Sequence, residues 1–288
     1  MIGDFAREEA AALLGWYADM GVDTALADEP QDRFAESAAA ETAALPPAKV
    51  PVQPGAASGR RERPLPGLRD PSPAVVIPAA ATRAQEDAVA DARALARTAE
   101  SLDELRALLE SYDGVSLRKT ASRLVFADGN PRARVMLVGE APGRDEDREG
   151  LPFVGRAGQL LDRMLAAIGL DRSKVYIANV VPWRPPGNRT PTPPEIALCL
   201  PFIKRQIELV DPDILVLLGG SAAGALTGAK DGILRLRGRW FDYDTGRRTI
   251  KALATLHPAY LLRTPSQKKL AWRDFRALKA ELEAKPSG

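Results

Sequence analysis

The stretch Ile214-Leu-Val-Leu-Leu218 decides the fold of this sequence. An uninterrupted apolar run of this length is typical of a strand that is buried on both faces of a parallel sheet. Arg134-Val-Met-Leu-Val-Gly139 and Val175-Tyr-Ile-Ala-Asn-Val180 have the same character and predict two further strands. Lys251–Leu256 is shorter and more polar, and we expect it to form a fourth strand at the edge of the sheet.

Helical patterns separate these strands. Residues 157–168 gather their apolar side chains on one helix face, and Thr192-Pro-Pro-Glu195 is a capping box that opens a second helix. Further helices are expected over 221–226 and 266–283. Strands that alternate with helices form a parallel sheet covered on both sides. The sequence therefore predicts an α/β fold, a three-layer αβα sandwich with a four-stranded parallel sheet.

Charge is distributed unevenly along the 288 residues. Residues 1–94 hold 9 Lys and Arg against 15 Asp and Glu, whereas residues 95–288 hold 31 against 23. The net charge of +2 is therefore the sum of −6 for residues 1–94 and +8 for residues 95–288, the basic body of the chain. A basic body suits a protein that binds a phosphate backbone, although many basic domains bind no nucleic acid.

Composition divides the chain into three parts. Residues 28–84 are rich in proline and alanine and cannot bury enough apolar surface to offset their ordering entropy, so we predict a disordered linker. Residues 1–27 precede it and predict a short N-terminal helical segment, which is either a weakly ordered appendage or a docking segment for a protein partner. Residues 85–288 hold the folded domain.

Single residues exclude several classes of protein. Cys199 is the only cysteine and His257 the only histidine, which excludes a disulfide framework, a thiolate zinc or iron–sulfur site and a histidine-rich metal centre. No apolar run is long enough to span a membrane, and the N-terminus lacks the pattern of a secretory signal. We therefore expect a cytoplasmic protein.

Polar residues follow the predicted strands where each one ends. Glu140 follows the first strand, Asn179 lies at the end of the second, Gly219-Gly-Ser221 follows the third and His257 follows the fourth. In open α/β sheets, ligands bind beyond the carboxyl ends of the strands. We expect these residues to converge on one ligand site.

The connecting loops hold further candidates. Phe153 lies in a glycine- and proline-containing loop and is either a core residue or a stacking platform. Glu146 belongs to the charged stretch 144–149, which is most simply a solvated loop, although Glu146 could reach the site. The proline-rich loop 183–191 is expected to grip a ligand. Leucines in His257-Pro-Ala-Tyr-Leu-Leu-Arg263 either form an apolar wedge for a nucleic-acid stack or fold back onto the core.

Taken together, these segments resemble a known family. They are Gly139-Glu-Ala-Pro-Gly143, Glu146-Asp147, Gly150-Leu-Pro-Phe-Val-Gly-Arg-Ala-Gly-Gln-Leu-Leu161, Asn179-Val-Val, Arg184-Pro-Pro-Gly-Asn-Arg189 and His257-Pro-Ala-Tyr-Leu-Leu-Arg263. Their order and spacing over roughly residues 100–283 are similar to those of the type-4 uracil-DNA glycosylases, in the uracil-DNA glycosylase superfamily. The resemblance implies removal of uracil, formed by cytosine deamination, from single- and double-stranded DNA, which initiates base-excision repair. It also implies a four-stranded parallel sheet between helices.

The resemblance assigns a task to each matching residue. It implies that Asn179 reads the uracil edge, that Phe153 stacks on the flipped base and that main-chain amides at Ala141 contact it. It makes His257 the donor to the uracil anion, and Glu140 or Glu146 the group that positions the attacking water, with Asn188 a further site residue. The expected DNA contacts are Leu261, which would fill the gap left by the base, together with Leu262, Arg263, Arg189 and Ser221.

One departure from the family concerns its cofactor. The family typically carries four cysteines that bind an iron–sulfur cluster. Tyr112, Val115 and Trp183 occupy three of those positions, and only Cys199 matches. A single thiolate cannot hold such a cluster. We therefore predict no cluster and no metal, with Cys199 in the core and the other three side chains filling the vacated space.

Two other functions remain open at this level. Glu140, Asp145, Glu146 and Asp147 would suit a metal-dependent phosphoesterase or nucleotide phosphohydrolase. A non-catalytic DNA-damage-binding protein would need no reactive site. For the glycosylase, we expect a monomer that works in the cytoplasm, associated with the nucleoid if bacterial. The sequence leaves open the range of damaged bases and the identity of the group that activates water.

Overall fold

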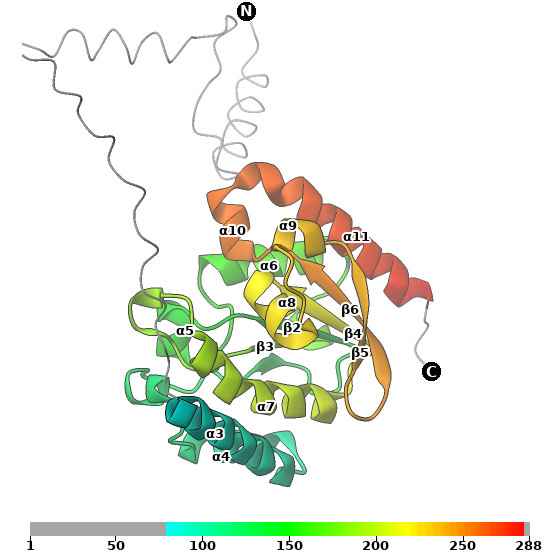
Figure 1. The fold of residues 1–288 in the computed structure, drawn as a ribbon. Helices are drawn as coiled ribbons and strands as arrows, with labels where there is room; N and C mark the ends of the chain where they lie inside the picture. The colour runs from blue at the N-terminus through cyan, green and yellow to red at the C-terminus, as the bar shows by residue number, and fades with distance from the viewer. Residues whose placement is uncertain (1–78, 285–288) are drawn as a thin grey trace, which may run out of the picture. The chain divides into compact units, whose positions relative to one another are not determined.

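The central sheet has the strand order β1-β3-β2-β4-β6-β5 (Figure 1). The computed structural model describes residues 79–284, so the predictions for 1–27 and for most of 28–84 lie outside the described residues. The four inner strands are parallel, as the sequence predicts, and the two outer strands are antiparallel to their neighbours. The strands are β1 Asp128–Gly129, β2 Val135–Gly139, β3 Val175–Asn179, β4 Ile214–Leu218, β5 Trp240–Asp244 and β6 Thr249–Thr255.

Helices cover both faces of this sheet, which confirms the three-layer α/β architecture. Every residue of β2, β3 and β4 is buried. One face packs against α4, α7 and α8, and the other packs against α6 and α11. The outer helix α3 packs along α7 (Figure 1). The helices are α3 Ala79–Thr98, α4 Leu102–Ser111, α5 Arg144–Glu149, α6 Arg156–Ala166, α7 Pro193–Val210, α8 Gly220–Thr227, α9 Ile233–Leu236, α10 Pro258–Arg263 and α11 Lys268–Ala284.

The register of the parallel strands brings their carboxyl ends to one edge of the sheet. Gly139 of β2 pairs with Asn179 of β3, and Leu218 of β4 pairs with Thr255 of β6. Val138 pairs with Leu217, which links the two halves of the sheet. The polar residues that end or follow these strands therefore emerge side by side, as the sequence predicts.

The sheet differs from the predicted one at its edges. Among residues 79–284 it has six strands, not four. The two additional strands are β1, which has only two residues, and β5, which forms a hairpin with β6. The turn of that hairpin is closed by the Thr245 N–H, which donates to Arg248 O at 3.0 Å, and Gly246 has a φ of 89°. The prediction that Lys251–Leu256 is an edge strand is therefore wrong, since β5 covers β6.

Several helices lie where the sequence predicted none, among them α9 and α10. Helix α3 begins at Ala79, so residues 79–84, which the sequence assigned to the linker, are helical. The charged stretch 144–149 forms the short helix α5 and is not a loop. Within residues 79–284, every helix is too short or too polar to serve as a membrane span.

Candidate active site

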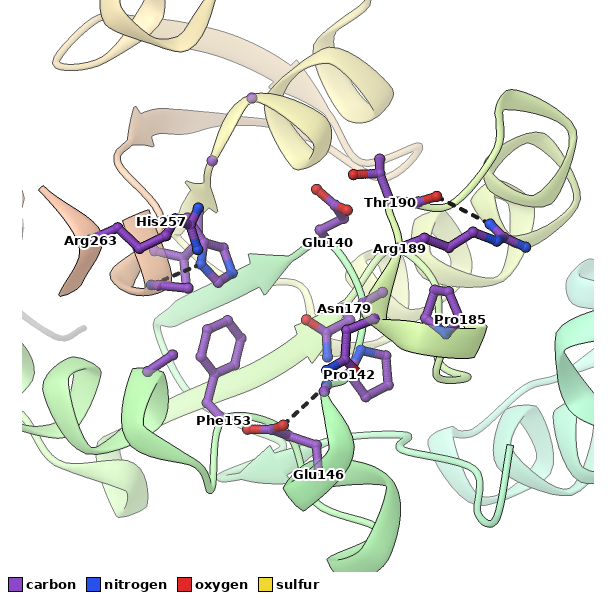
Figure 2. Close-up of a pocket in the computed structure, with 18 residues that line it drawn as sticks. Glu140, Pro142, Glu146, Phe153, Asn179, Pro185, Arg189, Thr190, His257 and Arg263 are labelled. Atoms are coloured by element: carbon purple, nitrogen blue, oxygen red, sulfur yellow. Dashed lines mark hydrogen bonds between the residues drawn. The ribbon is translucent and has the colours of Figure 1, made fainter. Parts of the chain in front are cut away.

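A pocket of about 480 Å³ opens at the carboxyl edge of the sheet (Figure 2). Its walls come from the ends of all four parallel strands and from the proline-rich loop. Most of the site residues that the sequence predicted line it, namely Glu140, Ala141, Glu146, Phe153, Asn179, Asn188, Arg189, His257 and Arg263. Convergence of these residues agrees with the expectation of one ligand site.

Asn179 presents a buried acceptor to the pocket. Its side chain is 4% exposed, and among the described residues its Oδ1 atom has no hydrogen-bond partner. Gly139 makes room for it, because a Cβ there would lie 2.5 Å from Asn179 Oδ1 and 2.6 Å from Phe153 Cζ. A buried acceptor without a partner is costly unless a ligand supplies the donor. The pocket is therefore shaped for a group with an N–H or O–H at this position.

Phe153 is held rigidly beside that acceptor. Its backbone has a φ of 55°, and its ring centroid lies 5.5 Å from that of His257 (Figure 2). Arg172 donates to Phe153 O and to Pro152 O, while Gly158 of α6 allows the main chain to approach, since a Cβ there would lie 1.5 Å from Phe153 O. The ring is 5% exposed, so it serves both the core and the pocket wall. Sequence reasoning missed both residues: Arg172 lies apart from the motifs, and Gly158 lies inside the motif 150–161 but was given no role.

His257 has a defined tautomer. The Ala259 N–H donates to His257 Nδ1 at 3.1 Å, so the ring proton of the neutral form belongs to Nε2. Burial, together with the positive charge of Arg263, lowers the pKa of His257 from 6.5 to about 4. At neutral pH, His257 is therefore an uncharged hydrogen-bond donor that faces the pocket.

The strand end that carries His257 is anchored from behind. The Thr255 hydroxyl donates to Asp274 Oδ2 at 2.7 Å, and Arg237 Nε donates to the same carboxylate at 3.0 Å. The Gly219 N–H donates to Thr255 O at 2.9 Å. Asp274 is 1% exposed and paired on two sides, which satisfies its buried charge. This network fixes β6 two residues before the imidazole.

Glu140 lies on the opposite wall, and its side chain extends toward Thr190 (Figure 2). Burial raises the pKa of Glu140, and hydrogen bonds from the hydroxyls of Ser221 and Thr190 oppose that rise. Ser221 therefore lies close to Glu140, and its contact with a DNA phosphate stays a prediction. Two hydroxyls therefore lie close to the carboxylate and favour its charged form.

Glu146 has a different environment. Its Oε2 accepts from the Gly143 N–H at 3.0 Å, and its Oε1 accepts from the Gly155 N–H at 2.9 Å. Both carboxylate oxygens are thus bound to main-chain groups of two separate loops. The geometry gives Glu146 the task of joining the turn after β2 to the loop before α6.

Arg189 has a partner within the chain, and the two wedge leucines differ in exposure. Arg189 forms a bidentate pair with Glu195 at 2.9 and 2.7 Å, which lowers the pKa of Glu195 to about 2. Its charge is therefore paired within the chain. Leu261 is 1% exposed and packs with Leu256 and Ala271, so its interpretation as the wedge does not fit this conformation, whereas Leu262 is partly exposed.

A family model described as the uracil DNA glycosylase superfamily matches residues 126–276, which is more than half of the chain. The chain belongs to the uracil DNA glycosylase superfamily. The chain is similar to type-4 uracil-DNA glycosylases. It is 41% identical to that of Archaeoglobus fulgidus over 183 residues, 62% of this chain and 92% of the relative. It is 46% identical to that of Thermotoga maritima over 151 residues, 52% of this chain and 77% of the relative.

The four positions at which the type-4 resemblance implies cluster-binding cysteines lie in or against the hydrophobic core. Cys199 and Val115 are fully buried, Trp183 is 2% exposed and Tyr112 packs its ring 4.9 Å from that of Phe202. All belong to, or pack against, one hydrophobic cluster. Burial raises the pKa of the Cys199 thiol. These residues do not fit the group, because they offer one thiol where four ligands are needed.

The acidic residues do not form a metal site either. Asp147 is buried, and its Oδ1 accepts from the Ser122 N–H at 2.8 Å, while Glu146 is bound to main-chain N–H groups. Among residues 79–284, no group of three or more His, Cys, Asp or Glu is placed to bind a metal ion. The alternative of a metal-dependent phosphohydrolase therefore has no support in this geometry.

The tautomer and pKa of His257 can be tested directly, because it is the only histidine. We expect the imidazole NMR signals of the folded protein to titrate near pH 4, with the proton on Nε2. The unfolded chain binds that proton near pH 6.5. The contribution of this group to stability is therefore lost as the pH falls from 6.5 toward 4.

Two controls accompany this titration. In urea, the midpoint should return to about 6.5. Arg263→Gln should raise the midpoint of the folded protein, because it removes a positive charge near the ring. A midpoint near 6.5 in the folded wild-type protein would contradict the assignment.

Proposed function

We propose that this chain is a DNA glycosylase that excises uracil from DNA and thereby initiates base-excision repair. The observation that carries the proposal is the buried Oδ1 of Asn179, which has no hydrogen-bond partner within residues 79–284 and lies beside the ring of Phe153. Uracil presents an N3–H donor next to the O4 acceptor, and a carboxamide matches both. Cytosine presents the opposite pattern and would leave buried groups unpaired, which is a strong basis for rejection.

The chemistry follows from the neutral imidazole. Cleavage of the N-glycosidic bond gives an oxocarbenium-like sugar and a uracil anion. His257 donates through Nε2–H to the anion at O2, and a donor fixed before the reaction has no reorganisation cost. Glu140, held by two hydroxyls, positions the attacking water. Glu146 is the weaker candidate for that task, because both of its oxygens are engaged.

The DNA backbone is contacted by the pocket rim. Arg263 lines the pocket and lies next to the partly exposed Leu262, so we assign the phosphate contact and the wedge to this pair. The +8 charge of residues 95–288 favours DNA over neutral ligands. We propose a monomer that acts on single- and double-stranded DNA in the cytoplasm, at the nucleoid if bacterial.

Uracil release tests the function. Wild-type protein incubated in EDTA with a uracil-containing oligonucleotide should leave abasic sites that alkali cleaves. Asn179→Ala should reduce base release about 10³-fold while DNA affinity is kept, because it removes the reading group alone. Asn130→Ala, in the exposed turn before β2, is the matched control and should retain activity. Wild-type protein that cleaves neither single- nor double-stranded substrate would refute the proposal.

Comparison of Leu262→Ala with Leu261→Ala tests the wedge. Leu262→Ala should reduce excision from double-stranded DNA about tenfold more than from single-stranded DNA, because only the duplex must be held open. Leu261→Ala should instead lower the free energy of unfolding by about 2–5 kcal/mol, since it empties a packed position. Equal losses on both substrates with Leu262→Ala would argue against the wedge.

We also propose that the enzyme works without an iron–sulfur cluster. Tyr112, Val115 and Trp183 fill the space with apolar side chains, so the loop and α7 are held by packing. Purified protein should contain no stoichiometric iron or acid-labile sulfide, by elemental analysis and colorimetric assay. Preparation under anaerobic conditions should give the same result. Iron and sulfide in stoichiometric amounts would show this proposal to be wrong.

A further inference from the structure

The proline-rich loop carries a polar contact that the proposed function does not use. Arg184 Nε donates to Asn188 Oδ1 at 2.7 Å. Asn188 lines the pocket, with its backbone in the left-handed region at a φ of 57°, whereas Arg184 does not line it. Arg184 therefore contacts a pocket-lining side chain without itself lining the pocket.

Arg184 is itself held by a buried acid. Its Nη1 lies 3.9 Å from Asp147 Oδ2, and the Asp147 side chain is only 5% exposed. The other oxygen of Asp147 accepts from the N–H groups of Ser122 and Arg123 at 2.8 and 3.2 Å. The acid is thus bound to the main chain of residues 122–123, and its negative charge attracts the guanidinium.

The chemistry of these groups determines the orientation of the amide. Arginine carries only donors, so the Asn188 atom that faces it must be the carbonyl oxygen. The NH₂ group is then the end that remains for a ligand. Asn179 presents its oxygen as an acceptor that has no partner in the described part of the chain, so the pocket holds two carboxamides of opposite polarity.

We propose that Arg184 and Asp147 are positioning residues that orient Asn188 as a hydrogen-bond donor toward an acceptor oxygen of the flipped nucleotide or its flanking phosphate. The inference rests on the proposed glycosylase function of this pocket. Without the guanidinium, the amide could turn and present its oxygen, which repels an acceptor. The contacts from Asp147 to Arg184 and from Arg184 to Asn188 fix the orientation of the amide before DNA binds. No binding energy is therefore used to orient it.

Substitution of Asn188 by its isostere tests the donor. Asn188→Asp keeps an acceptor for Arg184 but has no NH₂ group. We expect kcat/KM for a uracil-containing oligonucleotide to fall about 10²-fold, as far as in Asn188→Ala. A fall in kcat would assign the acceptor to the flipped nucleotide, and a rise in KM that steepens with salt would assign it to a phosphate. Wild-type kcat/KM in Asn188→Asp would overturn the inference.

A double-mutant cycle separates positioning from a merely structural role. Arg184→Met should reduce kcat/KM about tenfold, and Arg184→Met combined with Asn188→Ala should be no worse than Asn188→Ala alone, because Arg184 acts only through Asn188. Arg248→Met is the matched control, since it breaks an exposed pair with Asp211 away from the pocket and should retain activity. Multiplicative losses in the double variant would overturn the inference.

A readout without catalysis distinguishes this inference from the proposed function. The Arg184 Nε–H NMR signal should be protected from exchange in DNA-free protein, and Asn188→Ala should abolish that protection while Asn188→Asp keeps it. An inactive wild-type protein with this signature would refute the glycosylase function alone. If both variants keep the protection, or if both lose it, the positioning role of Arg184 and Asp147 is refuted, whatever the activity.

Discussion

The missing Cβ at Gly139 is the constraint on which the site depends. Asn179 at the end of β3 and Phe153 from the loop before α6 converge on the space that a methyl group there would fill. Their approach is also supported from behind, because Arg172 binds the carbonyl of Phe153 and Gly158 lets helix α6 lie against it. An acceptor and an aromatic face are therefore held at fixed separation before any ligand arrives, which is what recognition of a planar base requires.

Much of the fold and the site could be predicted, for identifiable reasons. Ile214–Leu218 is buried on both faces, so its composition alone indicates a parallel inner strand. Parallel strands bring their carboxyl ends to one edge, where Asn179 pairs with Gly139, the last residue of β2. The two-residue strand β1 depends on pairing with the distant strand β3, which leaves no local pattern. The covered state of β6 depends on a local hairpin with β5, whose polar strand the sequence did not predict. The inward orientation of Leu261 could not be read either, because it depends on how α10 packs against Leu256 and Ala271.

Some polar residues that the sequence predicts to contact DNA also have partners within the chain. Arg189 is paired with Glu195, and Ser221 lies close to Glu140. A motif shows which residue types gather at a site, but it does not show which of them are satisfied internally. Groups that hold each other keep the loops in place and reduce the side-chain ordering that DNA binding would otherwise require.

The proline-rich loop illustrates how such order is maintained from two sides. At its start, Trp183 packs in the apolar cluster with Cys199, and the Pro182 carbonyl accepts from the Val125 N–H at 2.9 Å. Within the loop, Arg184 forms an ion pair with Asp147 and donates a hydrogen bond to Asn188. Apolar packing fixes where the loop lies but is indifferent to which way an amide faces, whereas the guanidinium discriminates between its oxygen and its nitrogen. The apolar packing therefore fixes the position of the loop, and the arginine fixes the orientation of the Asn188 amide. A loop held by packing alone would keep its position, but its amide would no longer present a defined donor to the ligand.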